Sequence, residues 1–220
     1  MNPRAEQYIA ELRQSPDVLG VLLFGSWARG TNRPDSDVDL LVIVRRGFAR
    51  VVEEREGQAF EIIFTTEDDA AAFWRANPDD AADLWQCARV VFDRDGVMER
   101  LRRVGQEILA RGKPPISAEQ EAHARFDAHD QLRAIEALAG TDPRTARLLL
   151  SAKVLQLTEL YFDLRQLWRP PPKQRLGVLQ RQHAPFHESV AAYYDAHALP
   201  DQIRAAKQIA AAVFERGSGS

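Results

Sequence analysis

The chain has 220 residues, of which 45% are hydrophobic and 28% are charged, the ordinary balance of a globular protein with one or two domains. Its net charge of −3 argues against a non-specific nucleic-acid binder, whose domain would be clearly basic. No apolar run approaches the ~20 residues of a membrane helix, and the first residues do not read as a secretory signal. A single cysteine, Cys87, excludes an internal disulfide. We therefore expect a cytoplasmic protein that does not enter a membrane.

The first half of the chain mixes helical and strand patterns. It opens with an amphipathic helix, predicted over 3–14. Short apolar runs typical of buried strands follow at 18–24, 38–44, 59–65 and 89–92, the third of them after an acidic, glycine-containing connection. Thr66 and Asp69 resemble a capping box at the start of a helix, which Asn77-Pro78 interrupts before a second one. A further helix over 97–110 ends at Gly112.

The second half shows helical patterns alone. The segment Lys113-Pro114-Pro115 is the best domain boundary in the sequence. Beyond it we predict two long helices and three shorter ones, over 119–139, 144–168, 175–182, 185–197 and 200–215. We thus expect an α+β fold, in which a small mixed-sheet domain is followed by an all-α helical bundle. The expected boundaries are 1–112 for the first domain, 113–216 for the second and 217–220 for a flexible Gly-Ser tail.

The stretch from Gly25 to Asp39 carries the residues suited to chemistry. Gly25 ends a strand and lets the backbone approach a ligand closely, while Ser26 can cap a short helix whose free amides suit a phosphate. Asp37 and Asp39 open the next strand, where side chains two apart point to one face. Converging carboxylates repel unless a cation neutralises them, and Mg²⁺ takes both carboxylate and phosphate oxygens. The stretch therefore predicts a site for Mg²⁺ and a nucleoside triphosphate.

A solvated turn is the alternative interpretation of these aspartates, because aspartate is common in turns. It accounts well for Asp35. It accounts poorly for Asp39, which lies one residue inside an apolar strand, where a lone carboxylate is costly. The spacing from the Gly-Ser turn therefore favours the metal site.

The segment 25–40, GSWARGTNRPDSDVDL, resembles the Gly-Ser…Asp-x-Asp signature of the polymerase-β-like nucleotidyltransferase superfamily. More narrowly, it is similar to bacterial aminoglycoside-type adenylyltransferases and to the minimal nucleotidyltransferases of toxin–antitoxin pairs. The resemblance implies one or two Mg²⁺ ions held by Asp37 and Asp39, with ATP as the co-substrate. It also implies contacts to the triphosphate, for which the candidates are Gly25, Ser26 and Arg29. In the helical half Lys153 and Lys173 are further candidates, with solvated surface lysines as the alternative interpretation.

The same resemblance implies a third carboxylate on a neighbouring strand. Glu61 is the only acid inside the predicted strand 59–65, so we assign the role to it. Two functions stay open for this side chain. It either completes the metal site with Asp37 and Asp39, or it acts as general base on the acceptor hydroxyl, which it must then reach within hydrogen-bond distance. The structural alternative is an edge-strand glutamate that points to solvent.

The resemblance implies an enzyme that transfers a nucleoside monophosphate, AMP from ATP, to a hydroxyl of a small molecule, with an aminoglycoside-like antibiotic as the leading acceptor. The helical half resembles the C-terminal domain of such antibiotic-modifying enzymes and would bind this substrate. One alternative is an enzyme that adenylylates the partner protein of a toxin–antitoxin pair, although minimal enzymes of that kind lack so large a second domain. The other is a catalytically silent binding protein of the same fold, against which intact Ser26, Asp37 and Asp39 argue.

Overall fold

The structure is a computed structural model that describes residues 3–215. The Gly-Ser tail predicted over 217–220 lies outside the described residues. The chain divides into two compact units between Gly112 and Lys113, and each unit has its own core. Within 3–215, no helix combines the length and the apolar character needed to cross a membrane.

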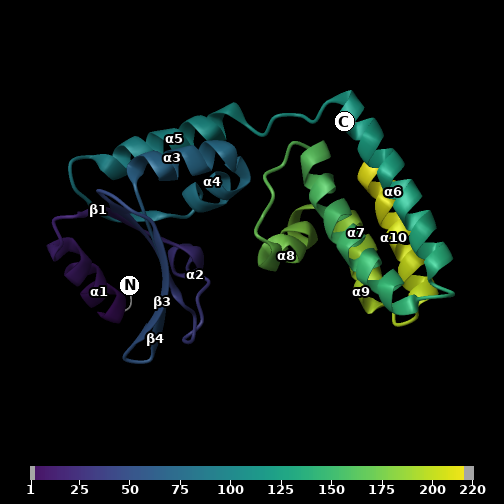
Figure 1. The fold of residues 1–220 in the computed structure, drawn as a ribbon, viewed down its shortest axis with the longest axis horizontal. Coiled ribbons are helices and arrows are strands. Elements are labelled where there is room, and N and C mark those ends of the chain that lie inside the picture. The colour runs from purple at the N-terminus through teal and green to yellow at the C-terminus, as the bar shows by residue number, and fades with distance from the viewer. Residues whose placement is uncertain (1–2, 216–220) are drawn as a thin grey trace. The chain divides into compact units, whose positions relative to one another are not determined.

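The first unit is built on a mixed sheet, of which β1, β3 and β4 are labelled in Figure 1. The sheet has five strands in the order β3-β4-β2-β1-β5. The strands are β1 Val18–Phe24, β2 Val38–Val44, β3 Ala49–Arg55, β4 Gln58–Thr65 and β5 Arg89–Asp93. β2 and β4 are parallel, whereas the other neighbouring pairs are antiparallel. All four apolar runs of the sequence are therefore strands.

The sequence pattern did not predict the edge strand β3. The prediction of a connection without a strand before 59–65 is wrong, because Ala49–Arg55 forms this strand. β3 and β4 form a hairpin whose two turn residues, Glu56 and Gly57, both have positive φ, at 51° and 76°. Such a two-residue turn matches the twist of the flanking strands. The β3 sequence ARVVEER is mostly charged, because an edge strand is half solvated and its charges discourage pairing with another sheet. This composition hides the strand from a search for apolar runs.

The helices of the first unit are α1 Pro3–Gln14, α2 Gly25–Arg29, α3 Glu67–Ala76, α4 Pro78–Trp85 and α5 Val97–Arg111. Helix α1 packs on the sheet through Tyr8, whose ring meets Phe60 of β4 edge-on at 4.9 Å. α3, α4 and α5 lie side by side (Figure 1). The predicted cap of α3 is confirmed, because the Thr66 hydroxyl accepts the amide hydrogen of Asp69 at 3.2 Å.

The packing of α1 decides which face of the sheet carries the site. The core against α1 takes alternate residues of the two central parallel strands: Val38, Leu40, Val42, Phe60 and Ile62. Successive side chains of a strand point to opposite faces. Asp39 and Glu61 lie between these core residues in sequence, so their side chains belong to the face of the sheet away from α1.

In the described residues 113–215 the second unit contains helices and no strands. The helices are α6 Ala118–Leu138, α7 Pro143–Leu164, α8 Pro172–Gln182, α9 Ala184–Asp195 and α10 Leu199–Phe214. α6, α7 and α10 run alongside one another (Figure 1) and bury residues such as Leu132, Leu150 and Ile209 between them. α7 ends four residues earlier than predicted, because the chain turns at Gln166, which has a φ of +54°. The predicted α+β fold, a mixed sheet followed by a helical region, is confirmed.

Candidate active site

Asp39 and Glu61 lie at the same level on neighbouring strands. In the parallel pairing of β2 with β4 the two residues are direct register partners, and on its other side Asp39 pairs with Phe24 of β1. Neighbouring strands are ~4.8 Å apart, and register partners share a face of the sheet. The carboxylates of Asp39 and Glu61 therefore emerge side by side on the face away from α1, and both residues are only partly exposed.

Gly25 makes room for the Asp39 carboxylate. A Cβ atom at position 25 would lie 1.8 Å from Asp39 Oδ2, which is far too close for two atoms that are not bonded to each other. Gly25 also has a φ of +66°, in the left-handed region that favours glycine. The carboxylate thus sits directly against the turn between β1 and α2, in space that any other residue at position 25 would fill.

Ser26 does not cap α2, so that part of the sequence prediction is wrong. The helix begins one residue earlier, at Gly25, and Phe24 occupies the cap position without a side-chain bond. Ser26 therefore lies in the first turn, and its carbonyl accepts the amide hydrogens of Gly30 and Thr31. Its hydroxyl remains next to the Gly25 turn, and its contact with a phosphate stays a prediction.

Asp37 is exposed and lies one residue before β2, so the strand geometry does not itself align it with Asp39. The loop that holds it is fixed by Ser36. The Ser36 carbonyl accepts hydrogen bonds from the Trp27 indole at 3.1 Å and from Gln58 Nε2 at 2.9 Å. Trp27 and Gln58 thus position this loop, and the sequence analysis missed both. No sequence motif indicates that an indole or an amide will bind a backbone carbonyl many residues away.

Arg29 is engaged inside the sheet unit. Its Nη2 forms an ion pair with Asp83 Oδ2 at 2.6 Å, and its Nη1 donates to the Cys87 sulfur at 3.1 Å, which ties α2 to the end of α4. Burial raises the pKa of the Cys87 thiol, an effect that the Arg29 charge only partly opposes. In this arrangement Arg29 anchors α2 to α4, and a direct contact with a nucleotide stays a prediction.

Lys153, another predicted triphosphate contact, lies in the helical unit. Its side chain is only 4% exposed, and its ammonium group forms an ion pair with Asp127 Oδ2 at 2.9 Å. The hydrogen bond from Lys153 holds the pKa of Asp127 below its ordinary value. A phosphate contact by Lys153 would require this pair to open.

The Lys153 pair gives a stability prediction. We expect Asp127→Asn to lower the free energy of unfolding at pH 7 by about 2–3 kcal/mol, because it leaves a buried ammonium without its counter-charge. The pKa of Asp127 is lowered by folding, so its contribution is complete above the ordinary value of ~3.9 and disappears as the pH falls further. Urea unfolding followed by circular dichroism should therefore separate variant and wild type at pH 7, and the difference should shrink as the pH falls below ~3.9.

Asp130→Asn is the matched control for this experiment. Asp130 lies on the same helix and pairs with Arg133, but both side chains are exposed. Exposed pairs of this kind contribute ~0.2–1 kcal/mol. Equal destabilisation by the two substitutions would contradict the structural role assigned to the Lys153 pair.

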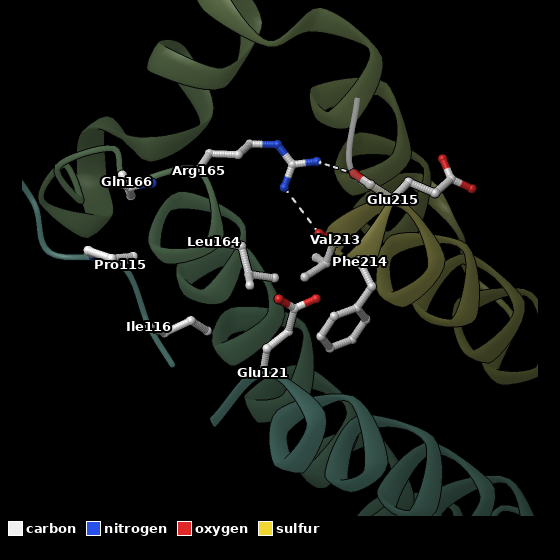
Figure 2. Close-up of a pocket in the computed structure, with 9 residues that line it drawn as sticks. All are labelled: Pro115, Ile116, Glu121, Leu164, Arg165, Gln166, Val213, Phe214 and Glu215. Carbon is white, nitrogen blue, oxygen red and sulfur yellow. Dashed lines mark hydrogen bonds between the residues drawn. The ribbon is translucent and has the colours of Figure 1, made fainter. Parts of the chain in front are cut away.

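The helical unit also contains a cavity of about 360 Å³ (Figure 2). Arg165, just after α7, donates across it to the backbone carbonyls of Val213 and Glu215 at 3.1 and 3.0 Å. These bonds satisfy carbonyl groups at the end of α10 that would otherwise have no helical partner. All the residues that line this cavity belong to the helical unit, so the sheet carboxylates form no part of it.

Within residues 3–215, no three His, Cys, Asp or Glu side chains are gathered into a ready-made metal centre. The residues at the sheet nevertheless fit a Mg²⁺ ion that arrives with a nucleotide. Such ions usually take one or two protein carboxylates and complete their shell with substrate phosphates and water. Asp39 and Glu61 supply two partly exposed carboxylates at one level of the sheet, with Asp37 in the adjoining loop.

The first unit thus sets a carboxylate pair on neighbouring strands of a mixed sheet, with Asp39 beside the glycine turn. Residues 5–73 match the model of the family described as "Nucleotidyltransferase domain". Residues 5–73 of the N-terminal unit are therefore similar to a nucleotidyltransferase domain, in agreement with the family and enzyme class expected from segment 25–40. The matched residues include every predicted site residue except Lys153 and Lys173.

Comparison with solved structures gives several similar chains, whereas no curated protein sequence matches. A nucleotidyltransferase-like protein from Exiguobacterium sibiricum is 14% identical with a TM-score of 0.51, over 95% of this chain and 72% of that one. At this identity the likeness shows the fold alone. Spectinomycin adenyltransferase from Enterococcus faecialis, solved with ATP and spectinomycin, is 10% identical with a TM-score of 0.37, over 96% and 97% of the two chains. A toxin–antitoxin structure with AMP-PNP is 13% identical with a TM-score of 0.32, over 56% and 95%. The last two likenesses are too loose to bear on function.

Proposed function

We propose that the chain is a cytoplasmic, Mg²⁺-dependent enzyme that transfers AMP from ATP to a hydroxyl group of a small, aminoglycoside-like molecule. The observation that carries the proposal is the register pair Asp39–Glu61, in which the Asp39 carboxylate lies against Gly25. The acceptor class is supported by the resemblance of segment 25–40 to aminoglycoside-type adenylyltransferases, and the helical unit is the proposed acceptor-binding domain.

Each residue of the site has a proposed task in this reaction. Asp37, Asp39 and Glu61 would hold the metal, which when bound neutralises charge on the attacking oxygen and on the leaving pyrophosphate. Gly25 and Ser26 present the turn on which the outer phosphates would lie. The acceptor oxygen forms a bond to the α-phosphorus as the bond to the bridging oxygen of pyrophosphate breaks. The hydroxyl proton leaves to a base or to solvent.

The test is pyrophosphate release from each of the four nucleoside triphosphates with Mg²⁺, against a panel of aminoglycosides and related hydroxylated amines. We expect turnover that requires one nucleotide, one class of acceptor and the metal, and that stops on addition of EDTA. Nucleotide binding is measured in the same samples. Binding without turnover on any small molecule would redirect the search to a protein acceptor, and absence of both would contradict the enzymatic proposal.

A further inference from the structure

Glu61 already has a cationic partner within the sheet. Arg50 of the edge strand β3 donates to Glu61 Oε1 from Nε at 3.0 Å and also from Nη2, so two N–H groups converge on one carboxylate oxygen. The Arg50 side chain is 63% exposed and that of Glu61 is 28% exposed. The partner is therefore held at the solvent side of the carboxylate rather than locked in the core.

The strand register places Arg50 on the face that carries the site. Val52 is the direct partner of Glu61 and Arg50 is the partner of Ile63, so Arg50 and Glu61 are diagonal neighbours on one face. Asp39 lies on the opposite side of Glu61, across the β2–β4 pairing. Glu61 is thus flanked by the Asp39 carboxylate on one side and by the exposed guanidinium of Arg50 on the other.

This arrangement sets up a competition. Asp39 and Glu61 at one level of the sheet repel each other unless positive charge lies close to them. A guanidinium and a divalent cation both meet that need at the Glu61 carboxylate. The two bonds from Arg50 occupy Glu61 Oε1, so a metal that takes this oxygen must displace them. An exposed ion pair between arginine and a carboxylate changes an equilibrium constant by only about a few-fold, so a metal ion can replace the arginine.

We propose that Arg50 is a built-in counter-cation for Glu61, which holds the carboxylate in place before the metal arrives and is displaced when the metal binds. The inference rests on the proposed function, since it assumes that a divalent cation uses Asp39 and Glu61. Arg50 is accordingly a positioning residue that acts through Glu61. Its removal should strengthen metal binding, whereas loss of a merely structural contact would weaken it or leave it unchanged.

The experiment measures Mn²⁺ binding to the full chain by electron paramagnetic resonance, with Mn²⁺ as the only ligand. We expect Arg50→Gln to lower the Mn²⁺ dissociation constant about two- to five-fold, the range expected for loss of one exposed ion pair. In a Glu61→Gln background the same substitution should have no effect, because the neutral amide no longer offers the negative charge for which Arg50 and the metal compete. Thermal unfolding of Arg50→Gln should match the wild type, since the side chain is largely exposed.

Arg46→Gln is the control for long-range charge, because it removes the same charge from an exposed position just before β3. An equal gain in Mn²⁺ affinity in Arg46→Gln would show that removal of any nearby positive charge has this effect, and it would overturn the proposal. The same gain from Arg50→Gln in the Glu61→Gln background would overturn it for the same reason. Unchanged or weaker binding in Arg50→Gln would overturn it as well. Asp39→Asn distinguishes failure of the proposed metal site from failure of the role of Arg50. If Asp39→Asn binds Mn²⁺ like the wild type, the proposed metal site itself is wrong. If it loses Mn²⁺ while Arg50→Gln changes nothing, only the role of Arg50 fails.

Discussion

Asp39→Asn is expected to lower kcat/KM for nucleotidyl transfer about a thousand-fold, the scale on which loss of several kcal/mol of metal-based charge stabilisation acts. The substitution keeps the size of the side chain and removes the charge beside Glu61 on the adjoining strand. Mn²⁺ binding should fall in parallel, because half of the register pair no longer coordinates. Steady-state pyrophosphate release and Mn²⁺ titration on the same preparation check both effects.

Asp35→Asn is the control for this prediction. Asp35 lies in the same loop but is exposed in a turn before Asp37, and it is the aspartate that a solvated turn explains. We expect its transfer rate to stay within about two-fold of the wild type, as for an exposed side chain outside the site. A wild-type rate in Asp39→Asn would refute the assignment of the metal site, whatever Asp35→Asn does.

Gly25→Ala is expected to lower kcat/KM at least about a hundred-fold, because misplacing a catalytic group by an ångström has an effect of that size. The added methyl group would overlap Asp39 Oδ2, so the carboxylate must move away from the turn. The positive φ of Gly25 adds a backbone cost of ~1–2 kcal/mol to the free energy of folding. Activity, Mn²⁺ affinity and urea unfolding should therefore all change.

Gly30→Ala separates the clash from the backbone cost. Gly30 ends the same short helix with a φ of +72°, nearly that of Gly25, but nothing lies within 4 Å of where its Cβ would be. Both variants should lose similar stability, while Gly30→Ala keeps most of its activity and Mn²⁺ affinity. Equal loss of activity in the two variants would contradict the claim that Gly25 is needed to leave room for the Asp39 carboxylate.

Much of the fold could be predicted from the sequence, because its signals are local. Apolar runs marked four strands, Thr66 marked the start of α3, and Lys113-Pro114-Pro115 marked the point where strand patterns end. The edge strand β3 escaped because its charged residues face solvent, where no hydrophobic pattern is required. The last turn predicted for α7 does not form, because the backbone turns at Gln166, a conformation that composition does not encode.

The sequence by itself determined the class of chemistry, since the Gly-Ser turn and the aspartates of segment 25–40 are neighbours along the chain and their types and spacing carry the signal. Only the tertiary structure decided which distant groups meet them. Pairing of β2 with β4 sets Glu61 beside Asp39, and the β3–β4 hairpin then brings Arg50 to Glu61. These contacts depend on strand register, and register follows from the burial of a whole sheet face against α1 rather than from any single motif.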